Sequence, residues 1–285
     1  MAEITATMVK ELRDKTQAGM MEAKKILTEV NGDMDAAIRS LREKNSKLEV
    51  KEGRTSAEGL VEAYVNESST LGSIIEINSE TDFVARNQEF ADLAKVLASH
   101  AAAYAKAKNI DELLDSPLSG TGAPARERLQ ASFAKLRENL IFKHFDVYLT
   151  ETGTIDAYVH TGGQVGVLIE LKGQGSEIKE LAREIAMHIS FSNPKYFKKD
   201  DVPVADVTQE REIVKTRTMN DPKNASKPPE ILEKIIEGGL GNFYKANVLL
   251  EQSYIRDEKQ TIGGLLKGKS EILRFKRFKI GEASS

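Results

Sequence analysis

The amino-terminal part of the chain repeats apolar residues at the spacing of an α-helix. A first apolar face follows Thr5, whose hydroxyl is suited to cap a helix, and it comprises Met8, Val9 and Leu12. A second face begins near Met20 and ends at Asn31-Gly32, because both of these residues tolerate a positive φ angle. Asp33 is placed to cap a third helix. The pattern therefore predicts a compact three-helix bundle over residues 1–44.

After a polar stretch at residues 45–57, which predicts a linker, the pattern changes to strands and then repeats itself. Residues 64–77 match residues 158–171 at a constant offset of 94. The next matching pairs are Leu93-Ala94 and Leu181-Ala182, whose offset is 88. We therefore expect two copies of one unit, the first of which carries six more residues between its strands and its helix.

Runs rich in β-branched residues predict that each copy opens with a hairpin. Helices and further strands follow, so the expected fold class is α+β with antiparallel sheets, in core halves at residues 58–150 and 151–285. At about residues 204–247, two charged amphipathic helices around a polar turn predict an inserted helical hairpin. Gly238-Gly239-Leu240-Gly241 breaks the pattern of its second arm and predicts an interruption or a kink.

The six added residues fall in a stretch that holds Thr81-Asp82-Phe83. In one interpretation Phe83 is a rigid apolar wedge with the fixed charge of Asp82 beside it, since aromatic residues are typical interface anchors. In the other, Thr81 caps a short helix and Phe83 packs into its own core. The repeat favours the first interpretation, because the second copy makes the same crossing with Gly173-Gln174-Gly175-Ser176 and has no such Phe.

Composition narrows the class of protein without identifying it. The chain has 285 residues, of which 40% are apolar and 30% charged, and this is the balance of a globular protein of about two domains. Its net charge of −3 gives no general attraction to nucleic acid. There is no Cys, no apolar run near the ~18 residues of a membrane span and no signal-peptide pattern, so we expect a cytoplasmic protein without membrane association.

No arrangement of residues points to covalent chemistry. The four histidines lack paired spacing, and neither a phosphate-binding glycine loop nor a nucleophile motif occurs, so we expect no metal, no cofactor and no enzyme activity. A metabolic enzyme with a scattered site stays an alternative, since a triad can be invisible in one sequence. Residues 186–191 are expected to be mostly core, and His188 is either a buried histidine, which periodicity favours, or a contact residue.

Several blocks of sequence resemble one known family. They are residues 4–13 and 18–25, Asn78 with residues 81–86, residues 185–189 followed by Pro194, and Lys227-Pro228, Phe243 and residues 250–252. In this order they resemble bacterial elongation factor Ts, the guanine-nucleotide exchange factor for elongation factor Tu. The resemblance covers nearly the whole chain, and several blocks in the right order are more specific than any one of them.

The resemblance implies a role for each block. Asp82 and Phe83 would reach into the G domain of elongation factor Tu beside its Mg²⁺ site, and this would promote release of GDP and allow GTP loading. The partner-binding loop as a whole would comprise Thr81, Asp82, Phe83, Val84, Ala85 and Arg86. A ubiquitin-associated-like (UBA-like) bundle would contact the same domain through Lys10, Arg13, Gly19, Met20 and Met21. Met187 and His188 would face another domain of the partner.

The chain departs from the family pattern in three places. Gln17 stands where Gly is common, Gly239 and Gly241 stand where longer residues are common, and the chain ends soon after Glu282 without the extra helical module of some members. Either a homodimer or a 2:2 complex with the partner stays open, although the lack of Cys excludes a disulfide-linked dimer.

A ribosome- or RNA-binding translation accessory protein without exchange activity is the second interpretation. It is suggested by Lys143-His144-Phe145 and by the alternation of basic and aromatic residues over residues 274–279. A half-buried strand with a charged outer face explains the latter more simply. Because the net charge also counts against it, we expect no direct contact with nucleic acid.

Overall fold

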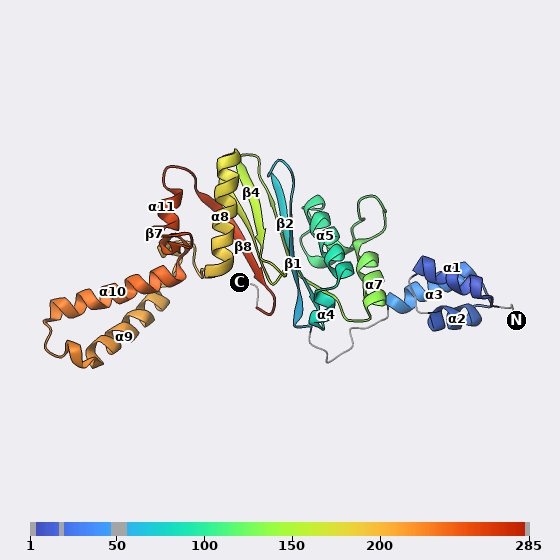
Figure 1. Ribbon diagram of the computed structural model, residues 1–285, viewed down its shortest axis with the longest axis horizontal. Helices are drawn as coiled ribbons and strands as arrows, with labels where there is room; N and C mark the ends of the chain where they lie inside the picture. The colour runs from blue at the N-terminus through green and yellow to red at the C-terminus, as the bar shows by residue number, and fades with distance from the viewer. Residues whose placement is uncertain (1–3, 17–19, 47–55, 283–285) are drawn as a thin grey trace. The chain divides into compact units, whose positions relative to one another are not determined.

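The computed structural model of the chain describes residues 4–16, 20–46 and 56–282 (Figure 1). The chain divides into two compact units. Unit 1 comprises Met1–Glu151, Val159–Leu168 and Lys276–Ser285, and unit 2 comprises Thr152–Tyr158 and Ile169–Phe275. Helices and antiparallel sheets occur together, so the predicted α+β class is confirmed. Among the described residues, no helix is both long and apolar enough to cross a membrane.

Three helices pack on one another at the start of unit 1: α1 (Ala6–Thr16), α2 (Met20–Glu29) and α3 (Met34–Ser46). Their shared core includes the buried Leu12, Leu27 and Leu41. As predicted, Thr5 caps α1 and Asp33 caps α3, since their side-chain oxygens accept the N–H groups three residues later at 3.3 and 2.9 Å. α3 runs into the segment predicted as a linker, most of which lies outside the described residues.

Unit 1 also holds an antiparallel sheet with the strand order β1-β2-β3, formed by β1 (Glu58–Val65), β2 (Leu71–Ser79) and β3 (Ile141–Leu149). The segment between β2 and β3 forms α4 (Asp82–Ala85), α5 (Gln88–Ala103), α6 (Ile110–Asp115) and α7 (Ala125–Leu136). The sequence pattern did not predict α6.

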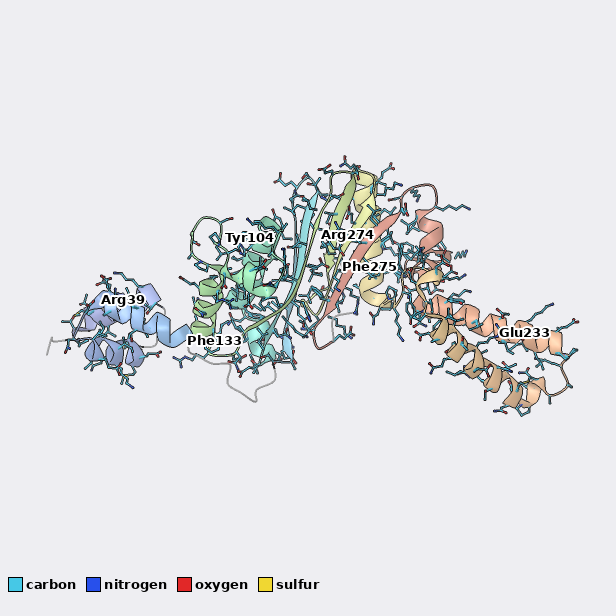
Figure 2. The ribbon with its side chains drawn as sticks, turned by 180° about the vertical axis from the view of Figure 1, so that it is seen from behind. Arg39, Tyr104, Phe133, Glu233, Arg274 and Phe275 are labelled. Atoms are coloured by element: carbon cyan, nitrogen blue, oxygen red, sulfur yellow. The ribbon has the colours of Figure 1, made fainter. Side chains whose placement is uncertain are left out.

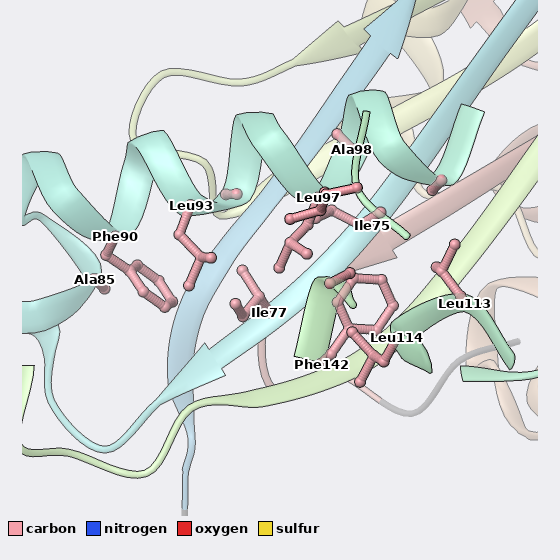
Figure 3. Close-up of a cluster of buried hydrophobic side chains, with 14 of the residues drawn as sticks. Ile75, Ile77, Ala85, Phe90, Leu93, Leu97, Ala98, Leu113, Leu114 and Phe142 are labelled. Carbon is pink, nitrogen blue, oxygen red and sulfur yellow. The ribbon is translucent and has the colours of Figure 1, made fainter. Parts of the chain in front are cut away.

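The core of this half lies between the sheet and α5. Phe90, Leu93 and Leu97 of α5 point toward Ile75 and Ile77 of β2, and all five side chains are buried (Figure 3). Because the 3.6-residue period of the helix and the two-residue period of the strand both bring apolar side chains to one layer, α5 is fixed along the sheet. The segment that joins β2 to α5 is thereby fixed at both ends.

The second sheet has the same plan, with the strand order β4-β5-β8. Its strands are β4 (Gly153–Val159), β5 (Val165–Lys172) and β8 (Ile272–Lys279), and α8 (Ser176–Ser192) follows β5 as α5 follows β2. In both halves a hairpin is completed by a third strand from much later in the chain. The structure thus extends the repeat to a strand that the sequence comparison did not align.

Unit 2 inserts two long helices and a short motif between α8 and β8. The helices are α9 (Val204–Asn220) and α10 (Pro229–Asn247), and the motif consists of β6 (Ser253–Tyr254), β7 (Asp257–Thr261) and α11 (Ile262–Leu266). Between α10 and β6, Leu249–Glu251 forms a 3₁₀ turn. The sequence also did not predict β7 or α11.

α9 and α10 pack against each other as a hairpin (Figure 1). α10 runs unbroken through its three glycines, so the predicted interruption is wrong. A Cβ atom at Gly239 would lie 2.4 Å from Val214 Cγ1 of α9, whereas one at Gly238 would meet no atom within 4 Å. Gly239 therefore permits the close approach of the two helices, and Arg211 of α9 bridges them by pairing with Glu233 and Glu237 of α10, of which Glu233 is labelled in Figure 2.

This packing predicts opposite effects for two neighbouring substitutions. Gly238→Ala should stabilise the hairpin by about 0.5–1 kcal/mol, the ordinary gain of alanine over glycine in a helix. Gly239→Ala should destabilise it, because Val214 is buried and β-branched and its methyl group has little freedom to move away. Amide hydrogen exchange in α9 and α10 measures both effects. Equal protection in the two variants would contradict the packing role of Gly239.

Candidate functional site

The segment of residues 81–86 is held in place by a residue far along the chain. Thr81 is the N-cap of α4, and its Oγ1 accepts a hydrogen bond from the Val84 N–H at 3.4 Å. The same hydroxyl donates to Glu138 Oε1 at 2.6 Å, and the Thr81 N–H donates to Glu138 Oε2 at 3.0 Å. Because one carboxylate binds both donors, Thr81 is fixed to the segment that follows α7.

Phe83 points away from the core that its neighbours join. Val84 and Ala85 are buried in the core under α5, whereas Phe83 is 83% exposed. The interpretation in which Phe83 packs into its own core is therefore wrong, although Thr81 does cap a short helix as that interpretation held. Burying a Phe side chain is worth about 1.5–3 kcal/mol, so its exposure gives up a stabilising contribution of that size. A role outside folding would account for this.

The charge of Asp82 is not neutralised strongly. Its Oδ2 lies 3.4 Å from Arg86 Nη2 in an exposed pair, and such pairs contribute at most about 1 kcal/mol. Just beyond, Glu89 accepts a hydrogen bond from Lys135 Nζ at 2.6 Å, and this contact holds the pKa of the Glu89 carboxyl below its usual range. The start of α5 is thus tied to α7, while Asp82 lies in an exposed pair with Arg86.

The corresponding crossing in the second copy is built differently. Gly173 and Gly175 have φ angles of 91° and 119°, which favour glycine, and α8 starts directly after them. The first copy instead uses the capped helix α4 to make the crossing. The first copy therefore holds Phe83 on a short capped helix that is anchored to Glu138, whereas the second copy crosses with glycines.

Four of the predicted contact residues in the bundle line one groove of about 580 Å³. They are Lys10, Arg13, Met20 and Met21, and Gly19 lies outside the described residues. Met20 and Met21 are 62% and 79% exposed, and Lys24 joins the other two basic residues along the groove. The groove therefore combines an apolar floor with basic groups.

His188 is a buried residue of α8, as periodicity predicted. It is 1% exposed, and its Nε2–H donates to Gln252 Oε1 at 2.9 Å. At the offset of 88 it matches His100, which is also buried and whose Nε2 lies 2.8 Å from Ser116 Oγ. A buried histidine at the same place in both copies is a feature of the scaffold, so the ring of His188 is not available for direct contact.

Phe191 was expected to lie in the core with the rest of residues 186–191, and this expectation is wrong. Phe191 is 81% exposed, although it lies only three residues beyond His188. Helical spacing could have indicated the exposure of Phe191. It lies seven residues after Glu184 and four after Met187, on the same helical face, and Glu184 is not a core residue type. The buried face of α8 instead carries residues such as Ile185 and Ile189.

The basic residues that suggested RNA binding are paired within the protein. Arg274, which lies on β8 (Figure 2), donates to Glu170 Oε2 at 2.6 Å. Arg277 and Lys279 both pair with Glu282, and Lys143 pairs with Glu76. These carboxylates reduce the positive field that a nucleic-acid surface needs. Within the described residues, no group of three or more His, Asp or Glu side chains could hold a metal ion.

Comparison with known proteins agrees with the resemblance found in the sequence. A family model described as elongation factor TS matches residues 80–282, a span that includes the whole Phe83 segment. The chain belongs to the elongation factor Ts family. An elongation factor Ts of Clostridium kluyveri is 39% identical over 290 residues, which cover 98% of this chain and 93% of that protein. One of Clostridium perfringens is 38% identical over 289 residues with the same coverage.

Within this elongation factor Ts family member, Glu138 is expected to control the order of the Phe83 segment. Glu138→Ala removes both acceptors of Thr81, so the amides of residues 82–86 should exchange faster with solvent by about tenfold, the effect of losing about 1.4 kcal/mol of local stability. Glu127→Ala, at an exposed glutamate of α7, is the control and should leave these amides unchanged. Unchanged exchange in Glu138→Ala would contradict the assigned anchor.

Burial lowers the pKa of His188 below the ordinary value of 6.5, with a smaller opposing effect of its hydrogen bond to Gln252. As the pH falls through 6.5, the unfolded chain binds a proton on His188 and the folded chain does not. The stability of the fold with neutral His188 is therefore fully present above pH 6.5 and is lost below it. From about pH 7.5 to pH 5.5, the thermal stability of the wild type should fall more than that of His188→Gln. The exposed-residue control His160→Gln should keep the wild-type pH dependence.

Proposed function

We propose that this protein is a guanine-nucleotide exchange factor that binds elongation factor Tu with GDP bound and promotes release of the GDP. Membership of the elongation factor Ts family supports this reaction class. The mechanism rests on one observation. The side chain of Phe83 is exposed, and Glu138 holds the segment that bears it through two hydrogen bonds to Thr81. No covalent bond is made or broken, so the protein acts by changing the affinity of its partner for the nucleotide.

In this mechanism the Asp82-Phe83 segment enters the partner beside its Mg²⁺ and nucleotide. Mg²⁺ requires near-ideal geometry of its oxygen ligands and waters, so a small displacement of the surrounding elements weakens the site. The Phe83 ring supplies the displacement, and the Asp82 carboxylate adds unfavourable charge near the phosphates. GDP then binds the joint complex more weakly, and by reciprocity GDP weakens the binding of the factor by the same ratio. GTP then fills the emptied site.

The bundle is proposed to dock on the same domain of the partner as a UBA-like module over residues 1–44. Its groove offers Met20 and Met21 between basic side chains, which suits an apolar surface flanked by carboxylates. Met187 is proposed to contact another domain of the partner. His188 is buried, so it is proposed to position its neighbours instead. The helical hairpin at about residues 204–247 is proposed to be a coiled coil.

The decisive measurement is release of labelled GDP from elongation factor Tu with this protein at micromolar concentration. The wild type should accelerate release, and Phe83→Ala should lose about tenfold or more of the stimulation, as expected for truncation of an interface anchor. The variant should fold normally because the ring is 83% exposed.

Leu149→Ala is the matched control, since Leu149 is a 66% exposed apolar residue of the same unit outside the Phe83 segment. It should retain full stimulation. Absence of stimulation by the wild type would refute the exchange function. Full activity of Phe83→Ala in a stimulating wild type would refute only the wedge.

A further inference from the structure

Two methionines at the start of α2 lie outside the core of the three-helix bundle. The side chains of Met20 and Met21 are both largely exposed, and they line the groove of about 580 Å³ together with Lys10, Arg13 and Lys24. The core of the bundle is formed by other residues of the three helices, so neither thioether is needed for its packing. Both side chains are therefore open to reagents in solution.

Methionine supplies the only sulfur atoms of this chain, because the sequence contains no Cys. Met8 and Met34 of the same bundle are half-buried and pack against its core, so solvent reaches them less freely than it reaches Met20 and Met21. Oxidation of a methionine requires access of the oxidant to its sulfur. The structure therefore ranks the pair in the groove ahead of these two methionines as a target for an oxidant.

We propose that Met20 and Met21 form a reversible oxidation site, at which hydrogen peroxide converts their thioethers to sulfoxides and thereby weakens binding of the GTPase. In each reaction the methionine sulfur attacks one oxygen atom of the peroxide, a sulfur–oxygen bond forms and the oxygen–oxygen bond breaks. The sulfur loses two electrons, and the other oxygen atom leaves as water with both hydrogen atoms of the peroxide. The effect on binding rests on the proposed function, whereas the site itself rests on the exposure of the two side chains.

Oxidation of the pair changes both the apolar and the basic part of the groove. A sulfoxide is polar, so the floor that Met20 and Met21 provide no longer favours contact with an apolar surface. The sulfoxide oxygen also accepts hydrogen bonds, and the Lys10, Arg13 and Lys24 side chains that line the same groove are donors. A donor that turns to a sulfoxide is no longer available to a carboxylate of the partner. The core beneath the groove keeps the oxidised bundle folded.

The order in which the methionines are oxidised tests the site. The full chain is treated with hydrogen peroxide, the peroxide is removed with catalase, and the oxidised fraction of each methionine is measured by peptide mass spectrometry. Met20 and Met21 should be oxidised several-fold faster than Met8 and Met34, because their side chains are more exposed. Oxidation of Met8 and Met34 at an equal or higher rate would overturn the oxidation site.

The effect on binding is measured as the ratio of the Kd for elongation factor Tu after oxidation to the Kd before it, with the peroxide removed before the partner is added. For the wild type this ratio should be about ten, as for the loss of an interface anchor. It should be near one for the variant Met20→Leu/Met21→Leu, since leucine is apolar, similar in volume and free of sulfur. Met219→Leu, at a 57% exposed methionine of unit 2, is the matched control and should keep the wild-type ratio.

Reduction of the oxidised wild type by the two methionine sulfoxide reductases, with dithiothreitol as the reductant, should restore its Kd. An equal ratio in the wild type and in Met20→Leu/Met21→Leu would overturn the effect on binding. Faster amide exchange at the core residues Leu12, Leu27 and Leu41 after oxidation would also overturn it, because the bundle would then be unfolding. If the wild type neither binds nor accelerates GDP release before oxidation, the exchange function is refuted and the effect on binding with it, while the order of oxidation still decides the site.

Discussion

Each of the two three-stranded sheets has a buried glutamate on its middle strand, and a cation from the third strand pairs with it. Glu76 of β2 is 1% exposed, with Lys143 Nζ at 2.8 Å and His144 Nδ1 at 3.0 Å. Its repeat equivalent, Glu170 of β5, accepts from Arg274 at 2.6 Å. A buried carboxylate left without its partner costs about 3–5 kcal/mol, so each third strand stabilises the middle strand that it pairs with.

This constraint explains how two copies of one scaffold can carry different insertions. β3 and β8 supply the cations. Each of these strands must therefore pair with its middle strand, whatever the length of the chain that connects the two. Between the second and third strands, the first copy holds the Phe83 segment, and the second holds α8 with Phe191 and the helical hairpin. The middle-strand pairing is thus shared, while the connecting segments differ between the two copies.

Local signals made much of this fold predictable from the sequence. The caps at Thr5 and Asp33 and the two hairpins follow from residue types within a few positions of one another, and the added segment around Phe83 follows from comparison of the two copies. Other features depend on a distant residue. Gly239 of α10 permits the close packing of Val214, and Thr81 is fixed by Glu138 from 57 residues away. A glycine run or a lone threonine gives no indication of such partners.

The same reasoning connects the two exposed aromatic residues. Phe83 lies two residues after Thr81, which Glu138 holds, and Phe191 lies one residue before Ser192, which Gln252 holds. At Thr81 both the backbone N–H and the hydroxyl donate to Glu138, and at Ser192 the hydroxyl donates to Gln252 Oε1, and both of these acceptors lie more than fifty positions away in the chain. An aromatic ring has only two side-chain torsions to order, so once its backbone is fixed little entropy is lost on binding. The long-range hydrogen bonds of Thr81 therefore support the role proposed for Phe83 as an interface anchor.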